Sequence, residues 1–93
     1  HIMTNKALFS DHILITPVEL PDDEEFELWA SIYLHNDAIS SLEFEQGADR
    51  HLMRFKFKNT SFNLNFEHYS QSIWINSDSQ QDLELLPELY SSL

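Results

Sequence analysis

The feature that most constrains the fold is an alternation of apolar and polar residues through residues 38–76, interrupted only by short polar segments. Alternation with a period of two places successive side chains on opposite faces of a β-sheet. The stretch MRFKFKNTSFNLNFEHYSQSIWI, residues 53–75, shows this pattern most clearly. It predicts four antiparallel strands that share one apolar face.

The polar segments between these strands also predict how the strands pair. A loop of odd length would set apolar side chains opposite polar ones, so each loop must contain an even number of residues. The first loop then spans residues 58–61, or is a tight turn at Asn59 and Thr60, and the others lie at residues 69–70 and 47–50. The predicted cross-strand pairs are Phe57 with Phe62, Phe55 with Leu64, Met53 with Phe66, Phe66 with Ile73, Leu64 with Ile75, Phe44 with Met53, and Leu42 with Phe55. All these residues share one face, so three hairpins predict the same core.

The acid-rich segment PDDEEFELWASIYLHN fits two patterns. Its apolar residues alternate as in a strand, but Phe26 and Trp29 belong to a set that also follows helical spacing. Asp22 is a good N-terminal capping residue, and Glu25 three positions later completes a capping box. The start of the segment therefore favours a helix over residues 22–35.

The two remaining elements flank this region. Residues 12–18, HILITPV, are rich in β-branched side chains and predict a first strand. Residues 79–93 predict a helix with a broad apolar side, and Ser79 with Asp82 resembles its cap. Pro87 lacks a backbone N–H, so this helix should kink or restart there.

Together these elements predict an α+β domain in two layers. The order βαββββα gives a mostly antiparallel five-stranded sheet, with both helices on one face. A chain of 93 residues suits one domain, which we expect to span residues 4–93. The opening HIM, residues 1–3, is interpreted as a vector remnant followed by the start methionine.

Charge and composition exclude several partners and settings. The formal net charge of −11 opposes extended contact with nucleic acid or an anionic membrane. The sequence contains no apolar run long enough to span a bilayer, and we expect no signal peptide before the domain. The absence of cysteine excludes disulfides and thiolate chemistry. We therefore expect a cytoplasmic protein without a cofactor.

The segments GADRHLMRFKF and FEHYSQSIWI carry a resemblance to a known family. An acidic residue followed by His-Tyr-Ser, a short gap and Ile-Trp resembles the small bacterial proteins of Domain of Unknown Function family 3630. The similarity extends over roughly residues 12–92 and is densest in residues 47–75. It implies a free-standing bacterial protein and supports the helix over residues 22–35. It implies no activity and no catalytic residue.

The polar face of the predicted sheet is the candidate functional surface. It carries Trp74, and residues 50–58 hold four of the five basic residues of the chain. A solvated face with ordinary cross-strand ion pairs explains the charges, since each pair contributes well under about 1 kcal/mol. It does not explain an indole facing water. In the predicted register Arg54 lies between Glu43 and Asn65, and Asn65 faces Trp74. The predicted partner-binding residues, on another protein or a second copy, are Trp74, Arg54, Asn65, Lys56 and Glu43.

Three other functions stay open. His51 and His68 fall opposite each other in the predicted register, with Asp49 nearby, and two imidazoles can begin a zinc site or a small active site. Zinc typically needs four ligands, or three and a water, and the spacing of known zinc motifs is missing, so we expect no metal. No nucleophile elbow or phosphate loop is present, which favours a non-catalytic protein. Two acid-rich helices would also permit a mimic of nucleic acid.

Overall fold

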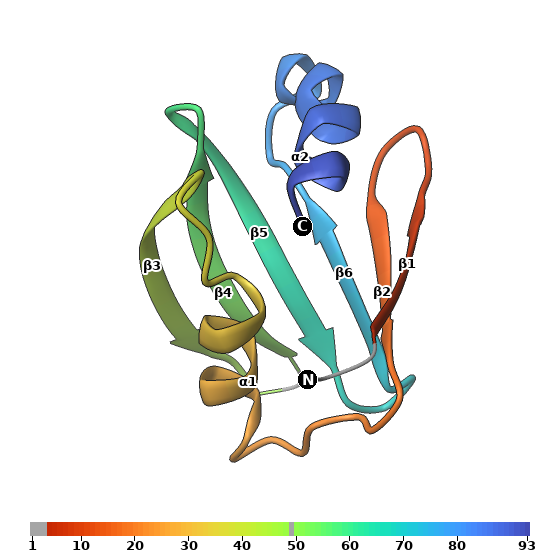
Figure 1. Cartoon of the computed structure of the whole chain (residues 1–93). Helices are drawn as coiled ribbons and strands as arrows, with labels where there is room; N and C mark the ends of the chain where they lie inside the picture. The colour runs from red at the N-terminus through yellow and green to blue at the C-terminus, as the bar shows by residue number, and fades with distance from the viewer. Residues whose placement is uncertain (1–3, 49) are drawn as a thin grey trace.

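The computed structural model of the chain describes residues 4–48 and 50–93 (Figure 1), so the proposed vector remnant at residues 1–3 and Asp49 lie outside it. The fold is α+β, as predicted. The strands are β1 (Thr4–Leu8), β2 (Ile13–Pro17), β3 (Ile39–Gln46), β4 (Arg50–Phe57), β5 (Thr60–Glu67) and β6 (Ser72–Asn76). The helices are α1 (Phe26–Tyr33), the short 3₁₀ helix η1 (Gln80–Leu85) and α2 (Leu86–Ser92).

The strands form one antiparallel sheet in the order β1-β2-β6-β5-β4-β3. The prediction of five strands is wrong because it omitted β1. The sequence of β1, TNKAL, has its only two apolar residues side by side, so it shows no alternation. As an edge strand it needs one partner only, and its pairing with β2 supplies the backbone hydrogen bonds.

Two of the three predicted hairpin registers are confirmed in whole or in part, and the third is wrong by two residues. Phe66 faces Ile73 and Leu64 faces Ile75, as predicted. Between β4 and β5, however, Phe55 faces Phe62 and not Leu64. The turn there consists of Lys58 and Asn59, which both have positive φ, as a tight two-residue hairpin turn requires. A shift of two residues keeps every side chain on its predicted face.

The β3–β4 hairpin contains a bulge that overturns one predicted pair. Phe44 faces Met53 as predicted, but the register shifts between Ser40 and Glu43. Ser41 has a φ of 56°. The extra residue turns Leu42 away from Phe55, and Leu42 is 39% exposed.

The start of α1 follows the predicted capping box. The backbone N–H of Asp22 donates to Glu25 Oε1 at 3.2 Å, and the N–H of Glu25 donates to Asp22 Oδ1 at 2.9 Å. Regular helix then runs only from Phe26 to Tyr33, shorter than predicted at both ends.

The C-terminal helix is divided as Pro87 predicted. The segment η1 ends at Leu85, and α2 restarts with Pro87 in its first turn, where a missing N–H leaves no hydrogen bond unmade. Ser79 occupies the N-cap position of η1, as predicted, but its side chain makes no capping hydrogen bond. The hydroxyl of Ser77 donates to Asp82 Oδ2 at 3.2 Å and accepts from the N–H of Ser79.

Both helices lie on one face of the sheet (Figure 1). Their side chains and those of the strands form one core. Phe55, Leu64 and Ile75 are fully buried there, as predicted. The buried apolar residues are Ile13, Ile15, Phe26, Ala30, Leu34, Ile39, Met53, Phe55, Phe57, Phe62, Leu64, Phe66, Ile73, Ile75, Leu86 and Leu89.

Lys6 ties β1 to the end of α2. Its Nζ donates to the carbonyl oxygens of Tyr90 at 2.5 Å and Leu93 at 3.0 Å. The Tyr90 hydroxyl donates in return to the Lys6 carbonyl oxygen at 3.2 Å. A cation at a helix C-terminus satisfies orphan carbonyls and complements the helix dipole. Lys58 forms an ion pair with Glu88 at the other end of α2, so two of the five cations hold this helix.

Candidate functional site

The sheet face that points away from the helices is the candidate site, and we call it the open face. It is built from the strand positions that alternate with the core residues. Its middle row crosses the whole sheet through cross-strand neighbours, in the order Ala7, Leu14, Trp74, Asn65, Leu52 and Glu45. This row is mostly apolar, which the polar appearance of the strands in the sequence does not suggest.

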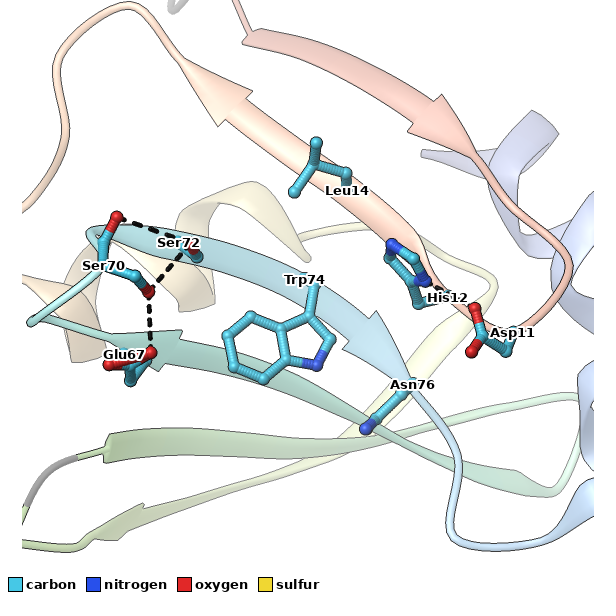
Figure 2. Close-up of a pocket in the computed structure, with 8 residues that line it drawn as sticks. All are labelled: Asp11, His12, Leu14, Glu67, Ser70, Ser72, Trp74 and Asn76. Atoms are coloured by element: carbon cyan, nitrogen blue, oxygen red, sulfur yellow. Dashed lines mark hydrogen bonds and ion pairs between the residues drawn. The ribbon is translucent and has the colours of Figure 1, made fainter.

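Trp74 lies at the centre of the open face, on β6 between β2 and β5. Its side chain is half-buried, and Figure 2 shows the indole lying along the sheet with a ring face turned to the viewer. The guanidinium carbon of Arg50 lies 5.8 Å from the ring centre, within the range of a cation–π contact. Among the residues that the structure describes, none accepts a hydrogen bond from the indole N–H. The indole N–H is therefore available as a donor, while Arg50 lies over the ring.

Asn65 lies beside Trp74 as predicted, but it is beneath the surface and only 3% exposed. Its amide nitrogen lies within hydrogen-bonding distance of the carbonyl oxygens of Trp74 and Asn63, each at 3.2 Å, and of Asn76 Oδ1 at 3.1 Å. A buried amide with several acceptors is held in one orientation. Asn65 therefore supports the strand that carries the indole.

The charged residues of the open face form a basic column on β4, which consists of Arg50, Arg54 and Lys56, with acidic residues on the neighbouring strands. Arg54 faces Glu43, as predicted, while its Nη2 lies 3.2 Å from Glu45 Oε2. Its neighbour on β5 is Asn63, so the prediction of Asn65 there is wrong by the same two-residue shift of the β4–β5 turn.

Lys56 is exposed and lies between Ser40 and Ser61, without a carboxylate as a cross-strand neighbour. The structure thus places four of the five predicted residues on neighbouring strands, as the cross-strand pairs Trp74 with Asn65 and Arg54 with Glu43. The fifth, Lys56, is at the margin of this group.

A shallow hollow of about 400 Å³ lies over Trp74 and Leu14 (Figure 2). At one end His12 Nδ1 lies 2.6 Å from Asp11 Oδ1, and this hydrogen bond lowers the pKa of the Asp11 carboxyl. At the other end the Ser70 hydroxyl donates to Glu67 Oε2 at 2.6 Å. The hollow thus has an apolar floor and polar ends.

Sequence reasoning missed Arg50, Leu14 and Leu52 as members of the site. A signal was present for the two leucines, because each is apolar at a strand position that points away from the core. The runs HILI and HLM therefore indicate strands with apolar side chains on both faces. Arg50 was counted among the cations, but its reach to Trp74 depends on a rotamer that the sequence does not encode.

His51 and His68 lie close together on the side of the sheet that carries the core. His51 is 3% exposed and packs edge-on against Phe26, Phe44 and Phe66. The His51 and His68 ring centres are 5.9 Å apart, although the residue opposite His51 is Phe66, so the predicted direct pairing is wrong. His68 Nδ1 lies 2.6 Å from Asp23 Oδ1. This arrangement closes one end of the core with aromatic rings.

We expect the fold to require no metal. Within residues 4–48 and 50–93 no three side chains of His, Cys, Asp or Glu converge in a way that could hold an ion, and the predicted neighbour Asp49 lies outside these ranges. A structural zinc ion contributes on the order of 10 kcal/mol, so its removal would lower the melting temperature by many degrees. A chelator should therefore shift the melting temperature by no more than about 1 °C. A stoichiometric metal that survives purification and is lost in His68→Ala would contradict this prediction.

The fold and the open face define a class: a two-layer α+β protein with one sheet face covered by helices and the other exposed. The chain belongs to the family described as "Protein of unknown function (DUF3630)", whose model matches residues 3–93. This match confirms the resemblance carried by residues 47–75. No curated protein and no solved structure shows a significant match to the chain. In the described part of the chain, no helix is long and apolar enough to cross a membrane.

Proposed function

We propose that this protein is a non-catalytic interaction module, which binds a protein partner through the open face around Trp74. The observation that carries the proposal is the indole itself. Trp74 is half-buried near the centre of a six-stranded sheet, next to Leu14 and with Leu52 two strands away. Tryptophan is among the residues that contribute most binding energy at the centres of protein interfaces.

The arrangement around Trp74 supports this proposal further. Protein interfaces combine an apolar centre with a polar rim, and arginine is enriched in them. Here the apolar row is bordered by Arg50 and Glu67 on one side and by Arg54 and Glu43 on the other. The charges would set orientation and association rate, while the indole would supply most of the affinity.

The setting that we propose is the cytoplasm of a bacterium, with neither nucleic acid nor membrane as partner. The net charge of −11 supports the exclusion of both anionic surfaces. Nothing specific in the site favours catalysis, because the hollow over Trp74 is shallow and open. His51, a candidate residue of the alternative active site, packs against the aromatic core.

The experiment that tests the proposal is Trp74→Ala. We expect the variant to keep its fold and to bind its partner, or a second copy, at least thirtyfold more weakly, which corresponds to about 2 kcal/mol. Binding is measured by sedimentation of the pure protein and by quantitative capture from the native cell. Tyr69→Ala is a matched control, because Tyr69 is an exposed aromatic residue in the β5–β6 turn, outside the open face.

A second variant guards against a loss of folding. Leu52→Lys adds a charge to the apolar row without removing a core residue, and it should weaken binding in the same assays. The proposal is wrong if Trp74→Ala unfolds the monomer while Leu52→Lys leaves all binding unchanged. In that case Trp74 would serve the stability of one chain only.

A further inference from the structure

We infer that the partner of the open face is a second copy of this chain, so that two molecules pack sheet against sheet about a two-fold axis. This inference rests on the proposed function and names the partner. It is carried by the way in which the charges are divided between the two layers of the molecule.

The strand residues of the open face are electrically balanced. They carry three cations, Arg50, Arg54 and Lys56, and three carboxylates, Glu43, Glu45 and Glu67. Their formal charges cancel, although the whole chain carries −11. The other two basic residues are engaged with α2. The chain therefore places three of its five basic residues on the strands of the open face, where they offset the carboxylates of the same strands.

This balance favours a copy over a basic or an acidic partner. A basic partner would be attracted to an acidic face, and the strands of the open face carry no net charge. An acidic partner surface would be attracted to a basic face, and the open face is not basic either, because the cations of its strands are matched by carboxylates. The strands of a second open face are balanced in the same way, so contact between the two sets of strand residues brings no net repulsion.

The charges are also arranged so that the face can complement itself. The basic column on β4 lies between Glu43 and Glu45 on β3 and Glu67 on β5. Strands are about 4.8 Å apart, and a two-fold axis that runs along the strands between β4 and β5 sets Arg50 of one copy over Glu67 of the other. A two-fold axis then makes every such contact twice.

The acidic regions would stay apart in this arrangement. Six carboxylates lie between Glu19 and Glu27, and three more, Asp82, Glu84 and Glu88, belong to η1 and α2. Most of these acids accompany the helical layer, which would form the two outer sides of the dimer. The helical layers would be separated by roughly 30 Å, from helix diameters and sheet spacings of about 10 Å. The Debye length at physiological salt is about 8 Å, so the repulsion between these layers is largely screened.

The open face also has enough extent for such a contact. The molecule measures 30 × 29 × 23 Å, and a stable interface buries roughly 800 Å² per partner. Ala7, Leu14, Trp74 and Leu52 supply an apolar row across it. The hollow beside the indole gives a place for a side chain of the opposing copy.

The test uses two variants of opposite charge on the open face. Arg50→Glu with Arg54→Glu makes the face acidic, and Glu43→Lys with Glu67→Lys makes it basic. We expect the wild-type chain to sediment as a dimer with a dissociation constant on the order of micromolar. Each variant alone should dimerise at least thirtyfold more weakly, because like charges then face each other. An equimolar mixture should form a one-to-one heterodimer, because the acidic open face of one variant then meets the basic open face of the other.

Two controls accompany the mixture. Lys58→Glu changes the net charge outside the open face and should leave the dimer intact. Trp74→Ala, introduced into both charge variants, should abolish the heterodimer. Circular dichroism and melting curves establish that each variant is folded before it is mixed.

The outcomes separate this inference from the proposed function. A wild-type chain that stays monomeric at several hundred micromolar overturns the inference, as does a mixture of folded variants that never associates. If capture of a different protein nevertheless depends on Trp74, the interaction surface stands and only its partner was wrongly named. If neither self-association nor capture depends on Trp74, both fail.

Discussion

Replacement of Phe55 by alanine is expected to lower the free energy of unfolding by about 3–5 kcal/mol, the loss typical of a large aromatic side chain in a packed core. Phe55 is fully buried on the central part of β4, and its ring lies 5.9 Å from that of its cross-strand neighbour Phe62. Truncation removes buried apolar surface and leaves a cavity that the sheet cannot close, because both neighbouring strands are fixed by backbone hydrogen bonds. Denaturant titration at low protein concentration measures the effect on the monomer.

Lys56→Ala is the matched control on the next residue. Lys56 lies on the open face and is exposed, so its loss should change the free energy of unfolding by less than about 0.5 kcal/mol. Equal losses at the two positions would mean that the assignment of faces on β4 is wrong. The comparison therefore tests the alternation on which the fold rests.

Phe26→Ala is expected to destabilise the protein by a similar amount, about 3–5 kcal/mol, for a different reason. Phe26 is fully buried and joins α1 to the sheet through an aromatic cluster. Its ring centre lies 5.3 Å from that of Phe66 and 6.4 Å from those of Phe44 and His51. The truncation would remove these contacts together, and α1 has only eight residues to hold it in place without them.

Leu28→Ala tests whether this loss comes from the buried side of the helix. Leu28 lies on the same helix and is 66% exposed. Alanine is also at least as good a helix former as leucine, so we expect a change within about 0.5 kcal/mol. Both variants are measured by urea unfolding followed by circular dichroism. If Leu28→Ala proves as damaging as Phe26→Ala, the packing of α1 described above is wrong.

The part of the fold that sequence predicts well is the part where side-chain pattern decides. The hairpins of residues 38–76 bury one face, and alternation determines that face whatever the exact turn. The positions where prediction failed depend on the backbone instead. Positive φ at Lys58 and Asn59 shortens one turn, and the bulge at Ser41 displaces Leu42. Neither the turn nor the bulge contains a glycine, the residue that usually indicates a positive φ in a sequence.

The candidate site could likewise be predicted only in part. Trp74 and the β4 cations could be placed on one face from alternation alone, and the structure puts them there. The apolar row could not be predicted, because it requires β2 to lie beside β6, and strand order is a property of the whole fold. The burial of Asn65 likewise follows from its two neighbouring strands and its hydrogen bonds.

The link between Lys6 and α2 has a consequence for the order in which the chain folds. Lys6 and its acceptors are separated by 84 and 87 positions, so these hydrogen bonds join nearly the whole length of the chain. Closing a loop of that length has a large entropic cost, which contacts within neighbouring hairpins avoid. The hairpins of β3 to β6 can therefore form early, and the docking of β1 against α2 completes the molecule. The same joint should open first in the native state, so amide protons of β1 should exchange with solvent sooner than those of β5.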